Sequence, residues 1–193
     1  MKPRTLLVLA FAIALPIGGC KKDPPPAPAP QPAATDDDEA RRRAEEEARA
    51  RAEREAAARA EAERQRQIEM ARSALTAMVF FEYNMANLTS EAQRILRDKV
   101  DILRANPTVQ LRIEGHADER GSTEYNIALG QRRAESVRSF FESFGLTANR
   151  FSLISYGEER PLDSGSNESS WSRNRRAAFI ITAGENDIQP VAR

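Results

Sequence analysis

Four runs of alternating or β-favouring residues predict the strands of one folded domain in the C-terminal part of the chain. They occupy residues 78–83, 109–115, 151–156 and 177–182. In the second run, Val109, Leu111 and Ile113 alternate with polar residues, which is the period-two pattern of a half-buried strand. Gly115 is predicted to end that strand.

Two segments between these strands have the three- and four-residue spacing of amphipathic helices. The first begins at Ser90, where Gln93 completes a capping box, and it ends at Asn106-Pro107. The second runs from about Ser122 to Phe144, and Gly145 supplies its C-terminal stop. We therefore expect an α/β sandwich of order β-α-β-α-β-β, in which both helices cover one face of a mixed sheet.

The loop G-H-A-D-E-R-G, which joins a strand to the second helix, carries the candidate chemistry. Its bounding glycines, Gly115 and Gly121, let the backbone turn sharply and leave Asp118 near the N-terminus of the helix. Asn126 and Arg133 are seven residues apart, so they share one stripe of that helix. Long helical side chains point back toward the N-terminus, which aims Arg133 at the loop.

An acid and a base would then flank one small concavity. Such a pair suits a zwitterion, because the carboxylate accepts from an ammonium and the guanidinium donates to a carboxylate. The free head group of an amino acid fits this description. The alternative is that Asp118 and Arg133 form a salt bridge that only fixes the loop, or that Asp118 only caps the helix.

The N-terminal residues are interpreted as an export signal with an anchoring site. Lys2 and Arg4 precede an apolar run at residues 5–17, which is shorter than a typical transmembrane helix. Cys20 is the one cysteine, so it cannot form an internal disulfide, and its place after Ile-Gly-Gly resembles a bacterial lipobox, in which the thiol is acylated. The alternative is an ordinary signal peptide with an incidental cysteine. By resemblance to lipoprotein sorting, Lys21 favours the outer membrane.

A proline-rich linker and a charged helix are predicted between the anchor and the domain. The sequence P-P-P-A-P-A-P-Q-P at residues 24–32 favours extended polyproline II. The Ala, Glu and Arg of residues 38–77 place acids four residues before bases, as in Glu39/Arg43, and predict a solvated helix of about 60 Å. Because no apolar heptad is sustained, we interpret it as a spacer, with a coiled coil as the alternative.

Composition argues against several classes of function. A chain of 193 residues with a formal net charge of zero gives no nucleic-acid signature. One histidine, His116, and one cysteine cannot form a metal cluster, so we expect no metal or cofactor. No Ser or Cys has a positioned histidine, and the separated carboxylates of a glycosidase are missing, so we do not expect an enzyme. Trp171 is interpreted as a hydrophobic plug, because no neighbour in sequence offers a second aromatic wall.

Four motifs then occur in order within about Met78 to Thr182: G-H-A-D-E-R-G, E-Y-N-I-A-L-G-Q-R-R-A, S-Y-G-E-E-R-P and N-R-R. In this order they resemble the OmpA-like peptidoglycan-binding family. The resemblance implies non-covalent binding of the diaminopimelate side chain of the peptidoglycan stem peptide. Tyr83-Asn84 stands where family members commonly have Phe-Asp, which keeps an aromatic contact and lacks a second acid. The implied binding residues, with Arg175 and Arg120 in support, are Asp118, Arg133, Asn126, Leu129, Tyr83 and Asn84.

With a lipidated Cys20, the resemblance implies an outer-membrane lipoprotein that faces the periplasm and tethers the membrane to peptidoglycan. It further implies contact with the periplasmic Tol propeller protein, in envelope integrity and cell division. The alternative is a wall-binding lipoprotein outside the Tol system, whose helix sets distance or binds another partner. The expected organisation is a signal peptide (1–19), a lipid-anchored linker (20–37), a charged helix (38–77), the binding domain (78–184) and a flexible tail (185–193).

Overall fold

The computed structural model describes residues 35–190. The chain divides into two units, Met1–Glu47 and Ala48–Arg193, and helix α1 (Asp36–Thr76) contributes residues to both. The predicted signal peptide, the lipobox at Cys20 and the proline-rich run lie outside the described residues. Between Thr35 and Pro190, no helix combines the length and the apolar character needed to cross a membrane.

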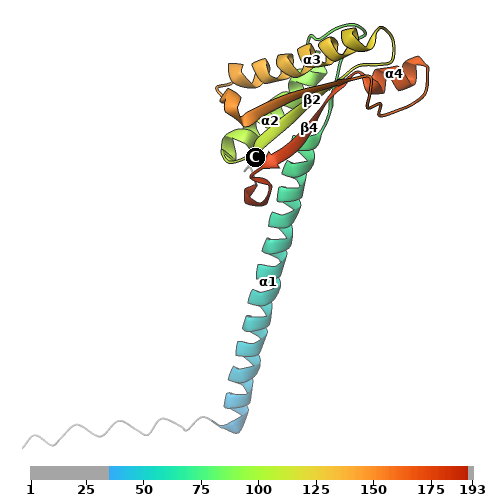
Figure 1. Ribbon diagram of the computed structural model, residues 1–193. Coiled ribbons are helices and arrows are strands. Elements are labelled where there is room, and N and C mark those ends of the chain that lie inside the picture. The colour runs from blue at the N-terminus through green and yellow to red at the C-terminus, as the bar shows by residue number, and fades with distance from the viewer. Residues whose placement is uncertain (1–34, 191–193) are drawn as a thin grey trace, which may run out of the picture. The chain divides into compact units, whose positions relative to one another are not determined.

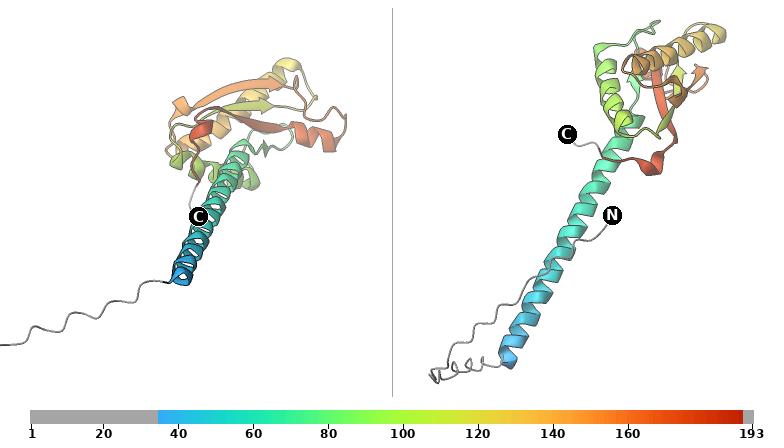
Figure 2. Two further views of the ribbon diagram at one scale, coloured as in Figure 1. Left: turned by 90° about the horizontal axis from the view of Figure 1, so that it is seen from below. Right: turned by 90° about the vertical axis from the view of Figure 1, so that its left-hand side faces the viewer.

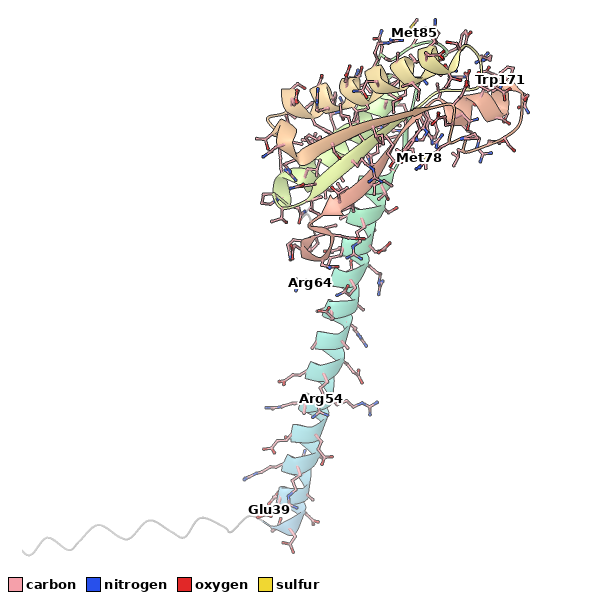
Figure 3. The ribbon with its side chains drawn as sticks, viewed as in Figure 1. Glu39, Arg54, Arg64, Met78, Met85 and Trp171 are labelled. Atoms are coloured by element: carbon pink, nitrogen blue, oxygen red, sulfur yellow. The ribbon has the colours of Figure 1, made fainter. Side chains whose placement is uncertain are left out.

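Helix α1 contains 41 residues, which corresponds to a length of about 60 Å. Four acids, Asp36 to Glu39, open it, where negative charge favours the helix dipole. Asp36 and Asp37 therefore belong to the helix and not to the linker. Ion pairs one turn apart, such as Arg51–Glu55 at 3.1 Å, lie along its exposed surface, and Figure 3 shows Arg54 extending from it. The predicted long charged helix is confirmed.

The last turns of α1 belong to the folded domain, which corrects the predicted boundary between residues 77 and 78. Ala71 and Leu75 are buried in its hydrophobic core. The last turn of α1 contains no basic residue of its own. Lys99 of helix α2 (Ser90–Ala105) caps this end instead, because its Nζ donates to the carbonyls of Ala74 and Leu75 at 2.5 and 3.0 Å. Burial lowers the pKa of Lys99 to about 7.

A four-stranded mixed sheet carries α2 and α3 (Thr123–Ser143) on one face, as Figures 1 and 2 show. The spatial order of the strands is β1-β4-β2-β3; β2 is parallel to β3 and antiparallel to β4, which also pairs antiparallel with β1. This confirms the predicted order of elements. The four strands are β1 (Val79–Phe80), β2 (Gln110–His116), β3 (Phe151–Gly157) and β4 (Arg176–Ala183).

Alternation along β2 separates the two faces of the sheet. Leu111 and Ile113 are fully buried beneath the helices, whereas Arg112 pairs with Glu114 at 2.8 Å on the other face. The loop between β3 and β4 contains a short helix, α4 (Glu168–Asn174), which the sequence pattern does not predict. Seven residues with a weak apolar pattern give no periodic signal.

Several predicted ends differ from the structure. Strand β1 ends at Phe80, although the sequence pattern predicts a strand as far as Tyr83. The N-cap of α2 is Thr89 and not Ser90, because the Thr89 hydroxyl accepts from the main-chain N–H of Ala92 at 3.1 Å. Strand β2 does not end at Gly115 but continues through His116. Gly115 is needed instead because the main chain of α3 approaches the strand at this point.

The prediction of a flexible C-terminal tail is wrong for residues 185–190. Ile188 is part of the hydrophobic core, and the main-chain N–H of Gln189 donates to Oδ1 of Asn106 at 2.7 Å. Arg72 of α1 also donates to the carbonyl of Glu185 at 3.1 Å. A single apolar residue in a polar segment gives no periodic signal, so its burial is not readable from the sequence.

Candidate ligand-binding site

The candidate site is a small hollow beside the first turns of α3. All six predicted binding residues line it, and Arg120 and Tyr125 complete the lining. The space that remains among them is about 20 Å³, room for roughly one water molecule. The lining residues are Tyr83, Asn84, Asp118, Arg120, Tyr125, Asn126, Leu129 and Arg133.

Asp118 is the buried acid of the hollow, with 4% of its surface exposed. Nε and Nη2 of Arg120 donate to its two oxygens at 3.1 and 2.7 Å, and Nη1 of Arg175 reaches one of them at 3.4 Å. Burial by itself raises the pKa of the Asp118 carboxyl, but the hydrogen bonds and charge of Arg120, with the bond from Arg175, hold that pKa below its usual value. Asp118 is therefore an anion at neutral pH.

Arg133 is the buried base, and it is fully enclosed. Its Nε donates to the carbonyl of Met85 at 2.9 Å, Nη1 to that of His116 at 2.7 Å, and Nη2 to that of Glu82 at 3.2 Å. Burial lowers the pKa of Arg133 to about 10, and the charge of Asp118 opposes this shift. A guanidinium carries five N–H groups, so one hydrogen on each terminal nitrogen is left after these three bonds.

The direct Asp118–Arg133 salt bridge, considered as an alternative from the sequence, is not how either charge is satisfied. Asp118 pairs with Arg120 and Arg175, while three N–H groups of Arg133 donate to main-chain carbonyls. Because those carbonyls belong to the loop after β1 and the end of β2, Arg133 also joins these two segments. The acid and the base thus line one hollow without neutralising each other directly.

Asn126 and Leu129 are buried on the stripe of α3 that faces the hollow. The Asn126 amide donates to the carboxylate of Glu158 at 2.5 Å and to the carbonyl of Arg120 at 3.3 Å. It therefore holds the loop that carries Asp118 against the segment after β3. Leu129 gives the hollow an apolar wall.

Asn84 and Tyr125 meet at the exposed side of the hollow. Asn84 has a positive φ of 56°, a left-handed conformation that Asn and Asp adopt more readily than most residues. Its side-chain oxygen accepts a hydrogen bond from the Tyr125 hydroxyl. The Asn84 oxygen thus links the loop after β1 to α3.

Trp171 is not the hydrophobic plug that the sequence suggests. Figure 3 shows it on α4, where it is half-buried, and its ring contacts Arg120. The Arg120 guanidinium stacks 4.2 Å from the Trp171 ring and 4.0 Å from the Tyr83 ring. The Trp171 N–H donates to Glu119 at 3.0 Å. The second aromatic wall therefore comes from Tyr83, 88 positions earlier in the chain.

Arg175, a predicted supporting residue, contacts Asp118. Its Nε donates to the carbonyl of Phe81 at 3.1 Å and its Nη2 to the carboxylate of Glu168 at 2.8 Å. With its contact to Asp118, it links the segment after β1, α4 and the acid of the hollow. Its side chain does not line the hollow itself.

His116 lies outside the hollow and contributes only its carbonyl to Arg133. Its ring is buried and stacks on Tyr156 at a centroid distance of 5.6 Å. Burial, with the charges of Arg176 and Arg160, lowers the pKa of His116 to about 4, so the imidazole is neutral.

Among residues 35–190, no group of three or more His, Cys, Asp or Glu side chains is placed to hold a metal ion.

The sequence pattern does not predict the place of Tyr125 in the lining, although a signal for it exists. Tyr125 precedes Leu129 by four residues and Arg133 by eight, so the three share one stripe of α3. Trp171 offers no such signal, because α4 reaches the site only through the tertiary fold.

The chain belongs to the OmpA family, whose model matches residues 80–175, a segment that contains every residue of the hollow. This confirms the resemblance seen in the motifs. The chain is 44% identical over 103 residues to the peptidoglycan-associated lipoprotein of Brucella melitensis, which covers 53% of this chain and 61% of that relative. It is 43% identical over 101 residues to the peptidoglycan-associated lipoprotein of Pasteurella multocida, covering 52% of this chain and 67% of the relative.

The fold is also similar to the crystal structure of the peptidoglycan-associated lipoprotein from Burkholderia pseudomallei. The TM-score is 0.53 at 35% identity, and the match covers 54% of this chain and 89% of that one. The chain spans about three fifths of the length of its Brucella relative, so the likeness concerns the folded domain.

Proposed function

We propose that this chain binds peptidoglycan non-covalently, by holding the head group of diaminopimelate between Asp118 and Arg133. The observation that carries the proposal is that a buried carboxylate and a buried guanidinium line one hollow. The side chain of diaminopimelate ends in an ammonium beside a carboxylate. Asp118 accepts from the first, and the two remaining N–H groups of Arg133 donate to the second. The names of the curated relatives support peptidoglycan as the polymer that is bound.

In the whole chain, this binding makes the protein a tether. Cys20 is the proposed site of acylation, which anchors the chain in the outer membrane with its domain in the periplasm. Helix α1 is the proposed spacer between anchor and domain. We propose that the tether then serves envelope integrity and cell division, including contact with the periplasmic Tol propeller protein, as the motif resemblance implies.

A second candidate is a wall-binding lipoprotein outside the Tol system. The observation that favours it is α1, whose 41 residues provide a long exposed segment for setting distance or binding a partner. The two candidates differ in one result. Capture of the Tol propeller protein from periplasmic extract by the full chain supports the first candidate, and failure of the full chain to capture it supports the second.

Binding is tested by co-sedimentation with purified peptidoglycan sacculi. Asp118→Asn keeps the shape of the side chain but removes the charge that meets the ammonium. We expect at least a tenfold loss of affinity, since a hydrogen bond to a charged group contributes about 1.5–3 kcal/mol. Asp101→Asn, on the exposed surface of α2, is the matched control and should sediment as the wild type does. Equal sedimentation of the Asp118→Asn chain contradicts the proposal.

A further inference from the structure

We propose that the Arg120 guanidinium occupies the position on Asp118 that the ammonium of the ligand must take. Binding then exchanges one cation for the other. The inference rests on the proposed function and adds a competitor that is built into the same site. Its starting point is the two-pronged contact of Arg120 with both oxygens of Asp118, at 3.1 and 2.7 Å.

The acceptor capacity of Asp118 is already used. Besides the two side-chain bonds from Arg120, its oxygens accept from the main-chain N–H of Arg120 at 3.1 Å and from Arg175 at 3.4 Å. A carboxylate offers about four lone-pair directions, and four donors occupy them. An incoming ammonium therefore finds no acceptor on Asp118 until one donor leaves.

Space leads to the same conclusion as hydrogen bonding. The hollow holds about 20 Å³, room for one water molecule and not for a head group of two charged groups. Asp118, Asn126, Leu129 and Arg133 are each at most 5% exposed, so these side chains are held by the core. One of the exposed members of the lining must move for the ligand to enter.

Arg120 is the donor that is free to move. Its side chain is 29% exposed, whereas that of Arg175 is 6% exposed and bonded to the carbonyl of Phe81 as well. A second acid is close enough to pair with it, because a Glu168 oxygen lies 3.6 Å from Nη2 of Arg120. The Arg120 side chain can thus leave Asp118 while keeping a charged partner.

Tyr83 and Trp171 hold the competitor in place. Their ring centroids lie 4.0 and 4.2 Å from the Arg120 guanidinium carbon, and a cation over aromatic faces is stabilised there. The apparent affinity is proportional to the fraction of molecules in which Arg120 has left Asp118. Arg120 and its two rings therefore weaken binding and restrict it to ligands whose cation displaces a guanidinium.

The test is calorimetric titration of the full chain with a stem tripeptide that ends in diaminopimelate. Arg120→Gln removes the competing charge, and we expect it to bind the peptide about five- to fiftyfold more tightly than the wild type. Arg120→Lys keeps the charge but loses the bidentate contact, so its affinity should lie between those of the wild type and Arg120→Gln. Arg173→Gln, which removes an exposed α4 arginine paired with Asp163, is the control and should match the wild type.

A second readout follows the exchange directly. Trp171 is the one tryptophan of the chain, so its fluorescence reports on its own ring. Peptide binding should change the emission of the wild type, as the guanidinium leaves the ring, and should change that of Arg120→Gln much less. A contribution of Arg120 that is only structural would not produce this difference.

The outcomes separate the two proposals. Tighter binding by Arg120→Gln supports the exchange, whether or not the wild type binds measurably. If the wild type binds and Arg120→Gln binds equally or more weakly, the exchange is wrong and the proposed function stands. If neither chain binds the peptide, both are overturned.

Discussion

Gly115 and Gly130 bring β2 and α3 into main-chain contact: a β-carbon on Gly115 would lie 1.8 Å from the carbonyl oxygen of Gly130. A β-carbon on Gly130 would in turn lie 2.3 Å from Oγ of Ser155 on β3. This close approach brings Arg133, less than one turn after Gly130, to the carbonyl of His116 at the end of β2. The geometry of the site therefore depends on two residues without side chains.

Gly115→Ala should destabilise the domain by more than about 3 kcal/mol, because the clash is with main chain that cannot rotate away. Gly145→Ala is the control: it has a positive φ of 82° but nothing within 4 Å of an added β-carbon. Its cost should be only the roughly 1–2 kcal/mol of a left-handed alanine. Urea unfolding measures both, and equal destabilisation would show that the contact is unimportant.

His116 should titrate far below an ordinary histidine, because its pKa is lowered to about 4 from 6.5. It is the one histidine of the chain, so its ring resonances in an NMR pH titration are unambiguous. The unfolded chain binds the proton more tightly, so stability should rise with pH between about 4 and 6.5. His116→Gln should remove this part of the pH dependence. A midpoint near 6.5 would contradict the buried, neutral ring.

The end of α1 should be required for the stability of the domain. A chain that begins at residue 78 lacks Leu75, which is fully buried, and the two carbonyls that accept hydrogen bonds from Nζ of Lys99. We expect it to be less stable than a chain from residue 60 by about 3 kcal/mol or more. A chain from residue 48 is the control and should match the chain from 60, since residues 48–59 are exposed. Equal unfolding midpoints for the chains from 60 and 78 would restore the boundary at residue 78.

The order of strands and helices is predictable from sequence because each element has its own period. The stripe of α3 is predictable in the same way. Its helical period places Asn126, Leu129 and Arg133 on one side of the helix, and this side lines the hollow with Asp118. What a period does not encode is contact between distant segments. Tyr83 and Trp171 meet over Arg120 only in the folded chain, and the competition at Asp118 depends on that meeting.

The glycine at position 115 shows a related limit. From the sequence it suggests the end of a strand, because glycine often ends regular structure. In the fold it lies inside β2 and is required by the helix that crosses it. The identity of the neighbour, Gly130, depends on tertiary packing, so no local pattern distinguishes the two roles.

The central claim is that Asp118 and Arg133 recognise the two charges of the diaminopimelate head group. The most direct measurement compares the affinity of the chain for a stem tripeptide ending in diaminopimelate with that for the same peptide ending in lysine. Lysine keeps the ammonium but lacks the carboxylate that Arg133 would bind. Loss of a hydrogen bond to a charged group, about 1.5–3 kcal/mol, predicts at least tenfold weaker binding of the lysine peptide. Equal affinity for the two peptides would contradict the claim.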